Sequence, residues 1–288
     1  NGFNVPMAKG YSNVNDAIEE VGIFHWPVIV KPVDSAGSKG VSKVEKPEYL
    51  KNAILHALES SHSGRFIVED FLELKGHQSS ADCFTIDGEL VYSDFSDQLF
   101  DKDAVNPYTP SLEIWPSSME KEQQEYLTNE LQRLFRLLDC KTGIYNVECR
   151  VCQDGKAYIM EVSPRAGGNR LIEMLKYVTG EDIVERATLA AVGEMFVPIT
   201  PSVDKGKQCI VEIILHANEP GIFSNLEISD NLKKIVVDED LWIKSGTKVE
   251  TFTGANMAIG TLALKAKSQQ DVSRVLALAK KGIKVIVS

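Results

Sequence analysis

Apolar and polar residues alternate along two neighbouring stretches, 146–152 and 157–162, which are separated by Gln153-Asp154-Gly155-Lys156. Alternation predicts half-buried strands, and Asp-Gly between two such strands is a strong signal for a hairpin. With Asp154 and Gly155 as the turn, residue 153 faces 156 and Glu148 lies opposite Glu161. One face is then apolar: Val147, Cys149, Val151, Tyr158, Met160 and Val162. The other is polar and is interrupted only by Ile159: Asn146, Glu148, Arg150, Glu161 and Ser163.

The rest of the chain mixes helix-like and strand-like patterns, which predicts an α/β (α+β) protein. Helices are expected at 14–21, 47–60, 118–138, 171–178, 183–196 and 269–282. Strands are expected at 26–33, 65–69, 82–86, 90–95, 208–215, 233–237, 258–264 and 284–287. Residues 98–116 contain three prolines and are predicted to be an irregular active-site loop. A polar linker is predicted at 198–207.

Composition narrows the class of protein. The chain has 288 residues, of which 43% are hydrophobic and 25% charged, enough for a core in two or three subdomains. The net charge of −10 argues against nucleic acid as a partner. No apolar run is long enough to span a membrane, and no signal peptide is visible. Five scattered cysteines indicate a reducing, cytoplasmic setting. The composition is compatible with a homo-oligomer as well as with a monomer.

Two opposed glutamates are the first candidate for chemistry. Like charges directly opposite on a sheet destabilise it, and a divalent cation between Glu148 and Glu161 would reverse that effect. Hard oxygen ligands suit Mg²⁺, with Mn²⁺ as the alternative. The competing interpretation is a hairpin face that is merely solvated. Cys149 and Cys152 are a poor metal pair, because residues three apart on a strand point to opposite faces.

A second candidate lies near the N-terminus. Lys31 interrupts an apolar strand, and a lone buried lysine costs free energy unless it meets an anion. The following loop, Gly37-Ser38-Lys39-Gly40, has backbone amides that could close over phosphates. It matches neither a Walker A loop nor Gly-x-Gly-x-x-Gly, so a plain turn stays the alternative.

A third candidate, Glu69-Asp70-Phe71-Leu72, follows an apolar strand. Its backbone could pair with a purine edge while Phe71 and Leu72 form apolar walls. An ordinary strand end with a solvated acidic pair is the alternative.

The order of these motifs resembles the ATP-grasp carboxylate–amine ligases over about residues 5–196. The matching elements are Val-Ile-Val-Lys-Pro, the Ser/Gly loop, Glu-x-Phe-Leu, Gly-x-Gln, and Asn-Val-Glu followed by Met-Glu-Val-Ser-Pro-Arg-Ala-Gly-Gly. Residues 208–288 resemble the closing subdomain of the L-amino acid ligase branch. The resemblance implies an ATP-grasp fold of two lobes with nucleotide between them. The small lobe is 1–68, the large lobe with the Mg/ATP and substrate site is 69–198, and a C-terminal α+β subdomain is 199–288.

The resemblance also implies roles for single residues. The ATP-binding set is Lys31, Ser35, Gly37, Ser38, Gly40, Glu69, Asp70, Phe71, Leu72 and Gln78. The metal set is Glu148, Glu161 and Ser163, and the substrate set is Arg165, Gly167, Gly168 and Asn169. The expected catalytic residues are Lys31, which would bind phosphate oxygens, and Arg165, which would bind the substrate carboxylate or acyl phosphate.

The chain departs from the family pattern at three points. Gln78 stands where the family commonly has a glutamate for the ribose, and Ser163 stands where many members have asparagine. The family has an N-terminal α/β domain and an earlier phosphate-binding lysine, which are expected before residue 1, so the chain is expected to be a fragment.

The resemblance implies an enzyme that uses ATP and Mg²⁺ to activate a carboxylate as an acyl phosphate. A small-molecule amine then attacks it to give an amide or a dipeptide, ADP and phosphate. The alternatives are a phosphoribosylamine-type ligase of purine biosynthesis, a carboxylase acting on bicarbonate, and a nucleotide-binding module without turnover. No Met-Lys-Met follows Gly254, which argues against a swinging-arm carrier.

Overall fold

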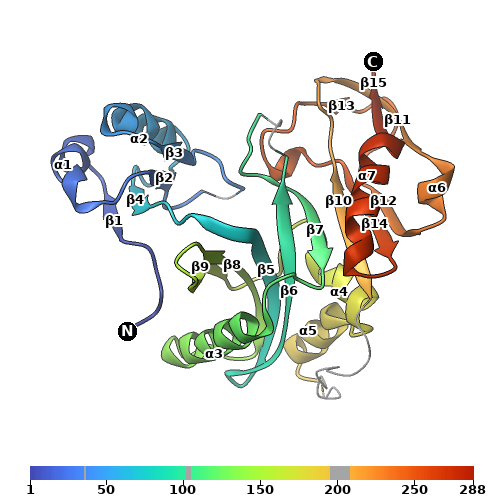
Figure 1. The fold of residues 1–288 in the computed structure, drawn as a ribbon, viewed down its shortest axis with the longest axis horizontal. Coiled ribbons are helices and arrows are strands. Elements are labelled where there is room, and N and C mark those ends of the chain that lie inside the picture. The colour runs from blue at the N-terminus through green and yellow to red at the C-terminus, as the bar shows by residue number, and fades with distance from the viewer. Residues whose placement is uncertain (36, 102–104, 195–207) are drawn as a thin grey trace. The chain divides into compact units, whose positions relative to one another are not determined.

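The computed structural model describes residues 1–35, 37–101, 105–194 and 208–288, which form two compact units. The smaller unit is Asn4–Glu73; the larger is Leu74–Ser288 with Asn1–Phe3. The smaller unit has an antiparallel sheet in the order β1-β4-β2-β3, with two α-helices (Figure 1). Its elements are β1 Ala8–Tyr11, α1 Val14–Glu19, β2 Val28–Pro32, β3 Ser42–Val44, α2 Leu50–Glu59 and β4 Phe66–Asp70.

The alternation of β2 explains the core of the smaller unit. Val28 and Val30 are fully buried and pack with Leu50, Ile54 and other side chains of α2. The alternate positions of β2, including Lys31, are therefore directed to the other face of the sheet.

The larger unit is built on an eight-stranded antiparallel sheet in the order β12-β14-β10-β7-β6-β5-β8-β9. The strands are β5 Leu74–Ile86, β6 Glu89–Phe100, β7 Pro110–Trp115, β8 Gly143–Cys152, β9 Ala157–Ser163, β10 Cys209–Leu215, β12 Val236–Leu241 and β14 Gly260–Ala266. A second sheet, β13-β11-β15, comprises β11 Gly221–Ile228, β13 Lys248–Val249 and β15 Ile283–Val287.

Two sequence predictions are corrected by these strands. The irregular loop at 98–116 is wrong at both ends, because β6 continues to Phe100 and β7 begins at Pro110. Strand 233–237 is also wrong in part: α6 Asp230–Lys233 occupies its start, and β12 begins only at Val236. Tertiary pairing accompanies both corrections: β7 lies between β6 and β10, and β12 pairs with β14 from Val236 onward.

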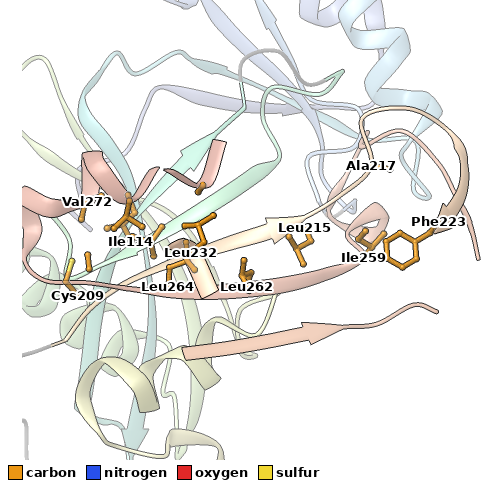
Figure 2. Close-up of a cluster of buried hydrophobic side chains, with 14 of the residues drawn as sticks. Ile114, Cys209, Leu215, Ala217, Phe223, Leu232, Ile259, Leu262, Leu264 and Val272 are labelled. Carbon is orange, nitrogen blue, oxygen red and sulfur yellow. The ribbon is translucent and has the colours of Figure 1, made fainter. Parts of the chain in front are cut away.

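Helices cover both faces of the large sheet. α3 Lys121–Leu137 packs on side chains such as Ala81 and Val147. α7 Val272–Gly282 packs on the same face further along, over the cluster drawn in Figure 2, where Leu215, Leu262 and Leu264 line β10 and β14. α4 Leu171–Thr179 and α5 Ile183–Ala191 pack on the opposite face, with Phe84, Trp115 and Ile210. They cover only part of that face.

The division into 1–68, 69–198 and 199–288 stays a prediction. The linker predicted at 198–207 lies outside the described residues. Beyond it, β10, β12 and β14 belong to the same sheet as β5 to β9. Among the helices that the structure describes, none is long and apolar enough to cross a bilayer.

Candidate functional site

Glu148 of β8 and Glu161 of β9 lie directly opposite each other at the edge of the large sheet. The predicted pairing is confirmed, although the predicted turn is wrong. The amide of Cys152 donates to the carbonyl of Lys156, and Gly155, with φ of +80°, donates to Cys152, so the connection has one residue more than expected. A compensating register shift between Glu148 and Cys149 restores the pair.

The same shift corrects the predicted faces of β9. Ile159 pairs with Cys149 and packs on the apolar cluster under α3, instead of interrupting the polar face. Tyr158 pairs with Arg150, and its hydroxyl donates to Asp154 at 2.6 Å. The glutamates stay on the face that α3 does not cover.

The glutamate pair lies among further oxygen and amide groups. Ser163 donates its hydroxyl to Glu161 at 2.9 Å, and the Gln78 amide lies 3.4 Å from a Glu148 oxygen. Mg²⁺ is held in proteins by one or two carboxylates together with phosphates and water. Two facing carboxylates are the donor set that this mode of binding requires. Among the described residues, no group of three or more His, Cys, Asp or Glu side chains is placed to hold a metal.

A row of polar side chains crosses the sheet beside this pair. Strand pairing aligns one residue on each strand in the sheet order β8, β5, β6, β7, β10, β14 and β12. The aligned residues are Arg150, Gln78, Gln98, Glu113, Glu212, Ala263 and Asp238, of which only Ala263 is apolar. Arg150 donates to Gln78 at 2.5 Å, Gln78 to Gln98 at 2.7 Å, and Gln98 to Glu113 at 2.9 Å. The amides thus form a chain that ends at Glu113.

Burial raises the pKa of two carboxyl groups in this row. It raises the pKa of Glu113 to about 8, against the opposing effect of hydrogen bonds from Ser96, Gln98 and Ser80. Burial also raises the pKa of Glu212 well above its usual value, and Glu113 adds to the effect. Two buried acids whose pKa values are both raised therefore lie side by side on β7 and β10.

Sequence reasoning missed Glu113, Glu212 and their partners, although a signal was present. Glu212 lies inside the apolar run Cys-Ile-Val-Glu-Ile-Ile-Leu, just as Lys31 lies inside Val-Ile-Val-Lys-Pro. The argument from the cost of a lone buried charge applies equally to both.

The turn after β9 holds the predicted substrate residues. The amide of Asn146 donates to the carbonyl of Arg165 at 2.8 Å, and the amide of Gly167 donates to buried Asp82 at 2.9 Å. Burial raises the pKa of Asp82 to about 6, opposed by hydrogen bonds from the Asn146 side-chain amide and the Gly167 backbone amide. The Arg165 side chain is exposed and donates to the carbonyl of Ala166. The backbone of this turn is therefore fixed at two points.

Gly167→Ala should destabilise the protein. A Cβ there would lie 2.8 Å from Leu171 Cδ1 and 2.9 Å from Asn146 Nδ2, and overpacking of this kind costs about 1–3 kcal/mol. Thermal unfolding should show a fall in Tm of several degrees. Gly168→Ala is the matched control, because a Cβ at Gly168 meets nothing within 4 Å. An equal Tm for the two variants would contradict this account.

In the smaller unit, two residues of the predicted ATP-binding set contact each other. Lys31 Nζ lies 2.8 Å from a carboxylate oxygen of Glu69, whose side chain is only 9% exposed. Gln78, from the same predicted set, belongs to the polar row of the larger unit.

The predicted loop follows β2. Asp34 anchors its start by accepting hydrogen bonds from Ser61, His62 and Ser63, which lower the pKa of Asp34 to about 2. Of the predicted residues, Ser35 is half-buried, and Gly37 and Ser38 both adopt positive φ, +68° and +59°. Gly40 packs closely on α2, because a Cβ there would meet Ser60 and Ala57. The loop is thus held at both ends.

The predicted purine-binding segment runs from the end of β4 into Phe71 and Leu72, which are half-buried. Asp70 accepts from the His25 backbone at 2.9 Å and its ring at 2.8 Å. The Phe71 amide donates to the Pro27 carbonyl, and Lys43 Nζ lies 4.3 Å from the Phe71 ring centre.

Comparison with known proteins gives a family. The profile of the ATP-grasp domain matches residues 24–173, just over half of the chain. The chain is 28% identical to the ATP-grasp enzyme fsqD of Aspergillus fumigatus over 171 aligned residues. The aligned segment is 54% of this chain. It spans only 29% of the length of that curated relative.

Solved structures agree in fold. An L-amino acid ligase from Bacillus licheniformis aligns with a TM-score of 0.79 and 17% identity, over 100% of this chain and 69% of the other. The biotin carboxylase domain of the Hydrogenobacter thermophilus 2-oxoglutarate carboxylase, solved with MgADP and bicarbonate, aligns with a TM-score of 0.77 and 16% identity. That alignment covers 98% of this chain and 63% of the other.

Proposed function

Because the chain belongs to the ATP-grasp family, we propose that it is a ligase that activates a carboxylate with ATP and joins it to an amine. The observation that supports this most is the pair of opposed carboxylates, Glu148 and Glu161, within the family match. In the proposed reaction a carboxylate oxygen attacks the γ-phosphorus, and ADP leaves. The amine nitrogen then attacks the acyl carbon, phosphate leaves, and the nitrogen loses its proton.

The residues of the larger unit would serve this reaction as follows. Glu148 and Glu161, with Ser163 beside them, would hold Mg²⁺, which supplies positive charge to phosphate oxygens. Gln78, with its amide already near Glu148, would bond the ribose hydroxyls. Arg165 is exposed at a fixed turn, so its guanidinium is available to a substrate carboxylate. Gly167 packs closely within the turn, and Gly168 and Asn169 would line the substrate beside it.

The smaller unit would contribute charge and an apolar surface. Lys31 would exchange its bond with Glu69 for phosphate oxygens, because an oxygen of higher charge binds an ammonium more strongly. Backbone amides of the loop containing Ser35, Gly37, Ser38 and Gly40 would cover phosphates. The Glu69–Leu72 segment, with Asp70 and Phe71, would contact the base. Catalysis would then depend on positioning and electrostatics, without a nucleophilic side chain.

ADP release tests the proposal. We expect release with ATP and Mg²⁺ only when a pair of amino acids or another acid–amine pair is supplied, and loss of release on chelation of the metal. At 17% and 16% identity the two solved structures show the fold alone, so the alternatives are outcomes of this assay. Release that depends on a ribonucleotide or bicarbonate would overturn the amine–acid pairing. No release with any acceptor, while ATP still raises Tm, would indicate a binding module.

A further inference from the structure

A small pocket lies at the β12 edge of the large sheet, where β12 begins beside the end of β14. We call it the β12 pocket. Its volume is about 220 Å³, and it is lined by Lys234, Ile235, Val236, Val237, Lys265, Ala266 and Lys267. None of these residues belongs to the predicted ATP-binding, metal or substrate sets. Pockets for drug-sized ligands measure about 300–1,000 Å³, so a ligand of the β12 pocket is small.

Three exposed lysines surround the β12 pocket, and no acid lines it. The Lys265 amide donates to the Ile235 carbonyl at 2.8 Å, which brings Lys234 beside the end of β14. Lys267 follows directly after that strand. The floor is apolar, because Ala266 is buried and the residues that begin β12 are half-buried valines.

The charge of these lysines is not balanced by a neighbouring carboxylate. Within the described parts of the chain, none of the three makes an ion pair, whereas Lys176 and Lys248 each lie 2.8 Å from an acid. The field of Lys267 reaches Asp271, but that carboxylate already accepts from Arg274 at 2.5 and 2.8 Å. Like charges around one pocket repel, so in a protein of net charge −10 this arrangement favours a bound anion.

The start of β12 also connects the β12 pocket to the substrate turn. The pairing of β12 with β14 shifts between Val236 and Asp238, which leaves Val237 as an extra residue. Both valines line the pocket, and the Asp238 carboxylate directly after them accepts from Arg170 at 2.6 Å. Arg170 is the N-cap of α4, immediately after the turn that carries Arg165. A ligand that orders this bulge therefore acts on the ion pair that anchors the turn.

We propose that the β12 pocket binds the phosphate group of a small phosphate monoester, and that the bound ligand acts as an effector of the substrate turn. A phosphate monoester carries a charge of about −1.5 to −2 at pH 7 and three strong acceptor oxygens, one for each ammonium. A carboxylate brings one charge and two oxygens, which is too little for three lysines. The apolar floor favours a ligand whose remaining part is apolar. The effect on catalysis rests on the proposed function, whereas the binding site does not.

Calorimetric titration of the unmodified chain without ATP tests the binding site. The probes are n-propyl phosphate, inorganic phosphate and neutral n-propanol. We expect n-propyl phosphate to bind, inorganic phosphate to bind more weakly, and n-propanol not to bind. Lys265→Gln and Lys267→Gln should each weaken n-propyl phosphate at least about 5-fold, because each removes a charge-assisted hydrogen bond. Lys284→Gln, at an exposed lysine of β15 outside the pocket, should leave the affinity unchanged.

Three results would overturn the binding site. The first is no binding of n-propyl phosphate by the unmodified chain, and the second is equal affinity in the two pocket variants. The third is a loss of binding in Lys31→Gln but not in the pocket variants, which would place the phosphate in the predicted ATP site. The pocket variants change exposed side chains, so an unchanged Tm should show that each variant is folded.

ADP release tests the effector role. Saturating n-propyl phosphate should change KM for the carboxylate substrate at least about 5-fold with kcat unchanged, and Lys265→Gln should abolish this response. A KM that does not respond, although the probe binds, would overturn the effector role. Binding with the expected pattern of variants but without ADP release under any condition would remove only the proposed function, because the titration requires no turnover.

Discussion

Glu161→Gln should lower ADP release by at least about 100-fold and leave the fold intact. Loss of residues that merely support a metal ligand costs 10–100-fold, so loss of a direct ligand should cost more. Glu161 is exposed, and its one described hydrogen bond comes from Ser163, which an amide oxygen can also accept. The measurement is initial-rate ADP release at saturating ATP across a range of Mg²⁺ concentrations, together with Tm.

A matched pair of variants makes the result specific. Glu148→Gln should produce a similar loss, because the two carboxylates face each other in the register. Glu239→Gln, also on an exposed strand residue of the same sheet, should keep full activity. Ordinary ADP release by Glu161→Gln at low Mg²⁺ would remove the metal assignment, and with it the main support for the ligase.

The hairpin shows what a sequence pattern can and cannot predict. Alternation and Asp-Gly identified both strands, and the opposition of Glu148 and Glu161 is correct. The turn and the bulge each shift the register by one residue, and the shifts cancel at the glutamates. The side chains between them, Ile159 among them, are on the other face from the prediction. Bulges depend on packing against α3, which alternation alone does not contain.

Long-range pairing is the other limit. Prolines made 98–116 look irregular, yet Pro110 can begin β7, where its missing amide hydrogen is tolerated. The polar row forms only when β8, β5, β6, β7 and β10 are ordered side by side. No local pattern contains that order, although the isolated charges at Glu113 and Glu212 were visible. A lone charge in an apolar strand therefore indicates a site, but not its partners.

Arg170→Ala should give the largest loss of stability among the variants considered. Its guanidinium lies 2.6 Å from Asp238, 2.8 Å from Glu173 and 3.3 Å from Asp240, and its side chain is only 18% exposed. Removing one partner of a buried ion pair costs about 3–5 kcal/mol, and partial exposure of the acids reduces this to about 2–3 kcal/mol. Calorimetry should show Tm lower by about 5–10 °C.

Two comparisons separate the causes of that loss. Arg136→Ala removes a bidentate bridge to Glu89 that is 63% and 60% exposed, and should cost less than about 1 kcal/mol. Arg170 also has a φ of +65°, so Arg170→Gly should be about 1 kcal/mol more stable than Arg170→Ala. Equal losses for Arg136→Ala and Arg170→Ala would contradict the stabilising role of the ion-pair cluster around Arg170.

Arg170 follows the turn that carries Arg165, and its ion pair with Asp238 connects that turn to β12. Loss of Arg170 should therefore also raise KM for the carboxylate substrate more than it lowers kcat.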